Sequence, residues 1–550
     1  MRVEPGPVPE QAQSVRIPMR DGTRLATDVY LPSGTGPWPA VLVRLPYDKN
    51  GGYCFMPEIA AYVTGRGYAA VVQDVRGKFR SEGATEFGIH EVSDGYDTVD
   101  WVCRQPWCDG DVVMTGDSYF GLTQLAAAAS GHPALRAISP RLTGTRLACV
   151  VDEAPDATTV EQTSRRGYFA THYVERDTYL WEPDWSARPL ADQFEQFFGA
   201  LGRRSVSYDT DLKEPDGLRG PSVDDLLDAP PLPVLFTVGW FDNCAVWSWP
   251  DIQRLLRHPR WASRLHLRLE AVDHENNRLA DVPITPDMDP SRSAEARARL
   301  IPRIVDPTLE FFDHCLGRSG AAETPRVAYE VCGEGWRTAE AWPPPSSGRT
   351  ELYAAPGQEE RRAGFVTSAP TGDDRVLRWS ARPEDLVPSI SENPFALVAG
   401  ARDLASDTTR SDVASVDTEP FTDGLVLAGP VDLHGTLTVE YRSTDLHARL
   451  LDMAPDGTGA LVARGQVRLT DIEGSKDFHV SLLHAGYRLR PGHSLRLHLA
   501  SSDYPEFMFN TGDGSDAWTA TAAPASTTAV RLGGPDGLRL TLTTLPAPQA

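Results

Sequence analysis

A serine between two glycines is the first candidate for chemistry in this chain. The stretch MTGDSYFG places Ser118 after an apolar run and before an alanine-rich run, with Gly116 and Gly121 on either side. A nucleophilic serine on an α/β sheet sits on a sharp turn from strand to helix, and small residues let that turn close. Serine is also a preferred N-cap of the helix that follows such a turn. The motif alone therefore leaves both interpretations open.

A general base and an acid are the partners that a nucleophilic serine requires. Asp242 ends the apolar run PVLFTVGWFD, and His274 follows the run LHLRLEAV. Both residues thus come at expected strand ends, in the chain order serine, acid, histidine that suits such a sheet. Asp273 and Glu275 adjoin His274, but neighbouring side chains on an extended segment point apart. Asp242 is therefore the predicted acid and His274 the predicted base.

An oxyanion hole needs two hydrogen-bond donors aimed at the developing negative charge. The backbone amide of Tyr119 follows the serine directly, and Tyr47 comes just after the strand-like run PAVLVRLP. We expect the Tyr47 hydroxyl to be the second donor. The alternative is that Tyr47 is an ordinary half-buried tyrosine.

Three patterns along the chain predict the elements that must position these residues. Up to about residue 145, short apolar runs alternate with helix-like segments, which is typical of an α/β layer with a parallel sheet. An aromatic-rich, helix-like stretch follows, and beyond about residue 325 short alternating segments between Gly, Pro and Asp turns favour an antiparallel sandwich. The expected domains are an α/β domain in two parts (1–145 and 232–325), a helical cap insertion (146–231) and a β-sandwich (326–550).

The cap and the acid also suggest where the substrate lies. We expect a pocket formed by Asp117, Tyr168, Phe169, Tyr173, Trp240 and Phe241. Asp117 would receive a cationic group of the substrate, or else it is a solvated turn residue. The aromatic residues would line an apolar pocket, or else they form the packing core of the inserted layer.

Charge and cysteine content exclude several classes of protein. The formal charge is −23 over 550 residues, without a long run of like charges or a clustered basic face, which argues against a nucleic-acid partner. No run of about 18 apolar residues indicates a membrane span. The seven cysteines are scattered without a CxxC pair, and the N-terminal stretch lacks an apolar signal segment, so we expect a cytoplasmic protein.

The motifs PYDK, DVRGKFRSEG, MTGDSYFG, GWFD and GPVDLHGTL together resemble the CocE/NonD hydrolases. This group comprises serine esterases and acylases such as cocaine esterase and α-amino-acid ester hydrolases, and it is related to X-prolyl dipeptidyl-peptidases. The resemblance implies an α/β-hydrolase domain with an inserted helical cap, followed by a C-terminal β jelly-roll sandwich. It also implies Ser118, Asp242 and His274 as the catalytic triad, Tyr47 and Tyr119 as oxyanion donors, and no metal or organic cofactor.

The sequence departs from this group before the histidine, where a GPW-type stretch is usual and LEAVDHENN stands here. The expected function is hydrolysis of an ester or amide bond through a covalent acyl-enzyme. Alternatives are an X-prolyl-type aminopeptidase, an amino-acid ester hydrolase or acyltransferase, and a binding protein on a disabled hydrolase scaffold. The expected partner is a small-molecule ester or amide, with neither nucleic acid nor membrane, and a homodimer is expected from the family alone.

Overall fold

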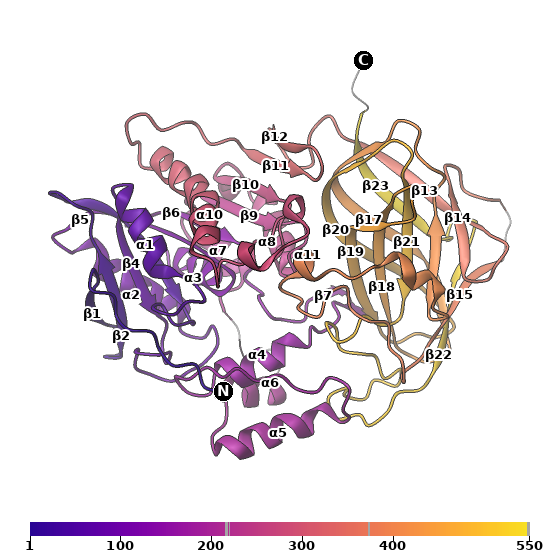
Figure 1. The fold of residues 1–550 in the computed structure, drawn as a ribbon, viewed down its shortest axis with the longest axis horizontal. Coiled ribbons are helices and arrows are strands. Elements are labelled where there is room, and N and C mark those ends of the chain that lie inside the picture. Colours follow the sequence, from indigo (N-terminus) through magenta and orange to yellow (C-terminus); the bar gives the residue numbers. More distant parts are fainter. Residues whose placement is uncertain (215–217, 219, 372–374, 547–550) are drawn as a thin grey trace.

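Two β-sheets lie side by side in this protein, with a group of helices beneath the junction between them (Figure 1). The computed structural model describes residues 1–214, 218, 220–371 and 375–546 of the 550-residue chain. The predicted cap and C-terminal domain include residues 215–217, 219, 372–374 and 547–550, which lie outside the described residues.

The first sheet carries the predicted chemistry. Its strand order is β1-β2-β4-β3-β5-β6-β9-β10-β11-β12. These strands are β1 (Gln13–Pro18), β2 (Arg24–Tyr30), β3 (Trp38–Leu45), β4 (Ala69–Asp74), β5 (Cys108–Asp117), β6 (Leu135–Arg141), β9 (Val234–Gly239), β10 (Leu265–Glu270), β11 (Val327–Val331) and β12 (Gly335–Ala339). The strands from β4 to β11 run parallel, and antiparallel pairs occur at the two edges. Parallel strands bring their carboxyl ends to one edge, where β3, β5, β9 and β10 all end.

Helices cover both faces of this sheet because alternate strand residues point to opposite sides. Val41 and Val43 of β3 pack in one core with α1 and α10, whereas Ala40 and Leu42 pack in another core with α2, α3 and α8. The helices are α1 (Met56–Gly65), α2 (Glu91–Cys103), α3 (Ser118–Ala129), α7 (Val223–Asp228), α8 (Ala245–Arg257), α9 (Pro259–Ala262) and α10 (Ala294–Cys315). The predicted α/β fold class is confirmed.

The cap lies below the junction of the two sheets (Figure 1). Its elements are β7 (Asp152–Ala154), β8 (Ala157–Thr158), α4 (Ser164–His172), α5 (Leu190–Leu201) and α6 (Val206–Lys213). The predicted cap, 146–231, needs two corrections. Helix α7 packs against α3 and α8 of the α/β domain, because Leu226 is apolar and fully buried there. The short strand β8 pairs with β19 of the second sheet.

The second sheet contains 13 strands, in the order β15-β22-β17-β23-β13-β14-β16-β21-β18-β19-β8-β7, with β20 paired to β17. Its C-terminal strands are β13 (Gly348–Pro356), β14 (Arg362–Val366), β15 (Val376–Ala381), β16 (Val413–Asp417), β17 (Leu425–Val439), β18 (Thr444–Met453), β19 (Gly459–Leu469), β20 (Ser475–Leu489), β21 (Ser494–Ala500), β22 (Ser526–Arg531) and β23 (Arg539–Leu545). The short helical turns are α11 (Leu397–Gly400), η1 (Leu279–Asp281), η2 (Pro286–Met288) and η3 (Ala405–Thr409). The jelly-roll connectivity stays a prediction.

The boundary predicted at residue 326 is wrong by about one hairpin. Strand β11 pairs in parallel with β10, and β12 pairs with β11, so residues 327–339 extend the first sheet. Alternating strands look alike in sequence whichever sheet they join, so the composition change at 325 could not reveal this.

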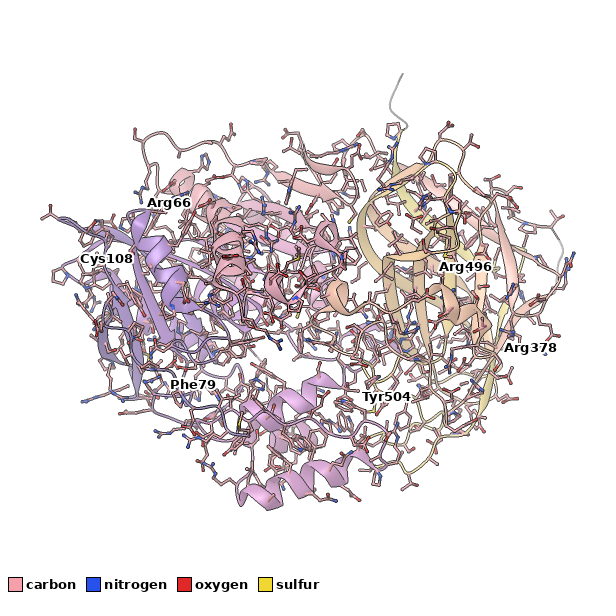
Figure 2. The ribbon with its side chains drawn as sticks, in the orientation of Figure 1. Arg66, Phe79, Cys108, Arg378, Arg496 and Tyr504 are labelled. Atoms are coloured by element: carbon pink, nitrogen blue, oxygen red, sulfur yellow. The ribbon has the colours of Figure 1, made fainter. Side chains whose placement is uncertain are left out.

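Side chains fill the space between the cap and the second sheet (Figure 2). Tyr504, labelled there, donates its hydroxyl hydrogen to the Trp185 carbonyl at 2.5 Å, and Arg188 stacks over its ring at 5.0 Å. The cap is therefore tied to the C-terminal domain. Among the described residues no helix is both long and apolar enough to span a bilayer.

Candidate active site

Ser118 lies at the sharp turn where β5 ends and α3 begins. Its φ is 56°, in the left-handed region that costs a non-glycine residue about 1–3 kcal/mol. Gly116 has φ 139°, and a Cβ there would lie 2.1 Å from the Phe120 ring. A Cβ at Gly121 would lie 2.5 Å from Thr143. Helix α3 begins at Ser118 and its N-cap residue is Asp117, so the interpretation of Ser118 as the N-cap is wrong.

His274 and Asp242 meet across the ends of neighbouring strands. Asp242 follows β9 and His274 follows β10, and the His274 Nδ1 lies 2.8 Å from the Asp242 Oδ1. A carboxylate only accepts hydrogen bonds, so Nδ1 carries the hydrogen and Nε2 keeps a free lone pair. The Asp242 side chain is fully buried and its Oδ1 also accepts the Cys244 amide at 3.0 Å. This arrangement suits a general base whose tautomer is fixed.

Neighbouring side chains shift the pKa of His274. Burial opposes protonation, but the Cys244 sulfur and the Asp242 carboxylate raise the pKa of His274 well above its ordinary value. Burial itself raises the pKa of the Cys244 thiol to about 11, so this thiol is neutral near pH 7. Asp242 is therefore the anion that stabilises the imidazolium form of His274.

Two predicted oxyanion donors lie beside Ser118. Tyr47 follows β3, and burial and the neighbouring Tyr168 raise its pKa well above the ordinary value, although a hydrogen bond with Ser118 acts in the opposite direction. The Tyr47 hydroxyl thus keeps its proton. The Tyr119 amide lies in the first turn of α3, where backbone N–H groups have no partner within the helix. The Tyr47 hydroxyl and the Tyr119 amide are therefore the candidate oxyanion donors next to Ser118.

The loop that carries His274 is fixed by its own polar side chains. Asp273 accepts the Asn277 amide at 2.9 Å and the Val398 amide of the C-terminal domain at 2.9 Å. Asn276 donates to Asp117 at 3.0 Å and accepts from Arg141 at 2.9 Å. His274 is therefore positioned by both domains.

Two cavities meet at Ser118. The larger one, about 560 Å³, lies among α1, α10 and the loop after His274. The smaller one, about 140 Å³, lies between the α/β domain and the cap. Residues that line both are Tyr47, Tyr53, Ser118 and His274. A carbonyl carbon placed at Ser118 would therefore have one substituent in each cavity.

The structure separates the six predicted pocket residues into two groups. Asp117 lines the larger cavity, but Arg141 binds its carboxylate at 2.9 Å, so it is neither a solvated turn residue nor a free anion. Tyr168 lines the smaller cavity. The prediction is wrong for the four buried residues that pack in the cores and line neither cavity among the described residues, namely Phe169, Tyr173, Trp240 and Phe241.

Sequence reasoning missed three residues of the site. Tyr53 lies in the loop after Tyr47, and Phe395 comes from the C-terminal domain, with its ring centroid 5.2 Å from that of His274. Glu275 lines the larger cavity and accepts from the Tyr53 hydroxyl at 3.3 Å. The acids around His274 gave a signal for Glu275, whereas nothing in the sequence links Phe395 to a histidine 121 positions earlier.

Two groups of three potential metal ligands occur among the described residues. In the first, Asp100, Cys103 and His132, the Ala134 amide donates to the His132 Nδ1, so its Nε2 carries the hydrogen and offers no lone pair. The second group contains Asp242, Cys244 and His274, whose geometry already suits a serine hydrolase. Neither group gives us reason to assign a metal.

Two family models match this chain. The model of the X-Pro dipeptidyl-peptidase (S15 family) covers residues 21–276, and that of the X-Pro dipeptidyl-peptidase C-terminal non-catalytic domain covers residues 319–535. The cocaine esterase of Rhodococcus sp. (strain MB1 Bresler) is 29% identical, and the match covers 92% of each chain.

Solved structures share the fold over nearly the whole chain. An α-amino acid ester hydrolase has a TM-score of 0.76 at 20% identity, with 98% of each chain covered. A CocE/NonD family hydrolase from Staphylococcus aureus has a TM-score of 0.65 at 15% identity, with 98% of this chain and 93% of that chain covered.

Proposed function

Because the chain belongs to the CocE/NonD family of serine hydrolases, which cleave ester or amide bonds, we propose that Ser118 is its nucleophile. His274 is the general base and Asp242 orients it. The observation that carries this assignment is the 2.8 Å contact between His274 and Asp242 at a point where two cavities share Ser118. A complete set of these groups also argues against a disabled scaffold that only binds.

The first half of the reaction forms an acyl-enzyme. His274 Nε2 accepts the Ser118 hydroxyl proton while the Ser118 oxygen bonds to the carbonyl carbon. The carbonyl oxygen becomes an oxyanion, which the Tyr47 hydroxyl and the Tyr119 amide stabilise. His274 then gives its proton to the leaving alcohol or amine, the bond to that group breaks, and the acyl group remains on Ser118.

The second half releases the acid. A water molecule gives a proton to His274 and its oxygen bonds to the acyl carbon. The second oxyanion collapses, the bond to Ser118 breaks, and His274 returns the proton to the serine. An amine in place of water would give acyl transfer by the same steps.

The substrate that fits is a small ester or amide with unequal halves. The smaller cavity is lined by rings such as Phe87, Tyr168 and Trp247, which favour a flat apolar group. The larger cavity has about four times that volume and accepts a bulkier half. Its charged lining favours an amino-acid ester hydrolase as the second candidate function.

The decisive experiment is intact mass spectrometry after reaction with a fluorophosphonate. We expect one adduct on the wild-type protein, none on Ser118→Ala and much slower labelling of His274→Ala. A folded wild-type protein that gains no adduct, or a Ser118→Ala variant that is labelled as fast, contradicts the assignment of the nucleophile.

We also propose a cellular location and an oligomeric state for this protein. We propose that the protein is cytoplasmic because its cysteines form no disulfide among the described residues, as a reducing compartment favours. Fractionation of the source cells tests this. A homodimer is proposed on the family resemblance alone, and light scattering of the purified chain tests it.

A further inference from the structure

Helices α1 and α10 give the larger cavity an apolar side. The lining residues that these two helices contribute are all apolar, namely Met56, Ile59, Leu300, Ile304 and Val305. Met56 and Ile59 stand three positions apart on α1. Leu300 and Ile304 stand four apart on α10, so each pair shares one face of its helix. Ile59 and Ile304 are only half-buried, so both helices present free apolar surface to the cavity.

This apolar side begins next to the nucleophile. Phe120 lies two residues after Ser118 in the first turn of α3, and it lines the larger cavity and is half-buried. Its ring lies edge-on to that of Tyr47, with the two centroids 6.2 Å apart. Val43 of β3 also lines the cavity, and it packs in one cluster with Phe120 and Ile304. Apolar surface therefore continues from Ser118 to α10.

Polar contacts hold α1 and α10 together without closing the cavity. Glu58 of α1 pairs with Arg297 of α10 at 3.4 Å, and the Tyr62 hydroxyl of α1 donates to Asp306 of α10 at 2.7 Å. None of these four residues lines the cavity. Ile59 lies between Glu58 and Tyr62 on α1 and keeps its free surface. The cavity is therefore preformed, and apolar cavities of this kind take up apolar groups more readily than water.

The charged residues of the larger cavity come from other segments of the chain. Arg141 at the end of β6 binds Asp117 at 2.9 Å, and Arg292 binds Asp289 at 3.2 Å before α10 begins. Glu275 belongs to the loop after β10. Charge and apolar surface are thus contributed by separate segments. The surface of α1 and α10 favours an uncharged aliphatic group, because burying apolar area is what that surface can offer.

We infer that the apolar side of the larger cavity binds an aliphatic chain of the substrate. This inference rests on the proposed function and names its substrate class: esters or amides with a flat acyl half and an aliphatic alcohol or amine half. The rings of the smaller cavity, such as Phe87 and Trp247, take the acyl half. Ile59 and Ile304 select for the chain, and they take no part in the proton transfers of the reaction.

The n-alkyl esters of benzoic acid test the chain site, because they vary the alcohol half alone. We expect wild-type kcat/KM to rise about two- to fourfold for each added CH2 from the methyl to the hexyl ester. The hexyl ester should therefore exceed the methyl ester by about thirtyfold or more. The measurement is the hexyl-to-methyl ratio of kcat/KM, taken below the solubility limit of each ester.

Matched variants locate the chain on the two helices. Ile304→Phe fills the site and Ile59→Thr places a hydroxyl group on its wall, so each should lower the ratio at least about fivefold. Ala298→Phe adds the same ring at an exposed position of α10 that does not line the cavity, and it should keep the wild-type ratio. Ser164→Phe narrows the smaller cavity and should slow the hydrolysis of all the esters alike.

Protection of Ser118 from the fluorophosphonate tests the same site without turnover. Hexan-1-ol should slow labelling of the wild-type protein at a concentration about tenfold lower than propan-1-ol requires, because it carries three more CH2 groups. In Ile304→Phe most of this difference should disappear, whereas in Ala298→Phe it should remain.

Two results overturn the inference: a wild-type hexyl-to-methyl ratio near one while methyl benzoate is hydrolysed, or a chain preference that survives both Ile304→Phe and Ile59→Thr. If Ser118 is labelled but no benzoate is hydrolysed, equal protection by the two alcohols overturns it. A wild-type protein that hydrolyses none of the esters and is not labelled at Ser118 instead contradicts the proposed function, and the inference falls with it.

Discussion

The two cavities beside Ser118 share the proposed catalytic residues but differ in most of their other lining residues. Both include Ser118, His274 and Tyr47, so both open onto the proposed reaction centre. The smaller one is built against the cap, and its described lining is rich in aromatic rings and contains no acid. The larger one is built from α1, α10 and the His274 loop and contains Glu275. We therefore propose that the shared residues set the rate and that the other lining residues of each cavity select one half of the substrate.

Removal of the shared nucleophile should have the largest effect. Ser118→Ala should lower kcat for every ester by about 10⁴-fold or more, because no other group in the site forms the acyl-enzyme. The measurement is the initial rate of hydrolysis of several aryl esters that differ in their acyl groups. Residual activity that remains high for some of these esters and not for others would mean that the cavities do not share one nucleophile.

The oxyanion donor should come next. Tyr47→Phe keeps the ring and removes the hydroxyl, so we expect kcat to fall by about 10²–10³-fold, as for loss of one donor in other oxyanion holes. KM should change little, because the hydroxyl acts on the charge that develops during the reaction. A large rise in KM with an unchanged kcat would instead mean that Tyr47 contributes to substrate binding and does not stabilise the oxyanion.

The pH profile should report the shared base. Burial lowers the pKa of His274, but the neighbouring Cys244 and Asp242 groups raise it above its ordinary value near 6.5. The protonated imidazole cannot accept the Ser118 proton. We therefore expect kcat/KM to fall about tenfold per pH unit below a midpoint that lies above 6.5. Asp242→Asn should move the midpoint to lower pH, because it removes the anion that stabilises the imidazolium. A wild-type midpoint at or below 6.5 would contradict this account.

The smallest effect should come from the wall of the smaller cavity. The Tyr168 hydroxyl donates to the Tyr47 hydroxyl at 3.3 Å, a long hydrogen bond that orients the oxyanion donor. Tyr168→Phe should lower kcat by about three- to tenfold, as expected for loss of one neutral hydrogen bond. If Tyr168 acts through Tyr47, the loss should be equal for all acyl groups and absent in a Tyr47→Phe background. A fall in kcat that occurs only with bulky acyl groups would instead mean that Tyr168 affects substrate selectivity alone.

Local sequence was enough to place the three residues proposed for the reaction centre at one edge of the sheet. Ser118, Asp242 and His274 each follow a short apolar run, and parallel strands of a buried sheet must end at one edge. The chain order and the glycines at 116 and 121 then restrict the alternatives. The same reasoning failed for Trp240 and Phe241, because closeness to Asp242 in sequence does not determine where a side chain packs, and both side chains enter the core.

The sequence by itself thus determined the α/β class, the order of the reactive residues and the type of turn that carries Ser118, since all three depend on local periodicity and on glycine. Only the tertiary structure decided that β11 and β12 join the first sheet, that Phe395 of the distant C-terminal domain lies against His274, and that Glu275 lines the larger cavity beside Ser118. These facts depend on which segments meet in space, and a short-range pattern carries no record of such contacts.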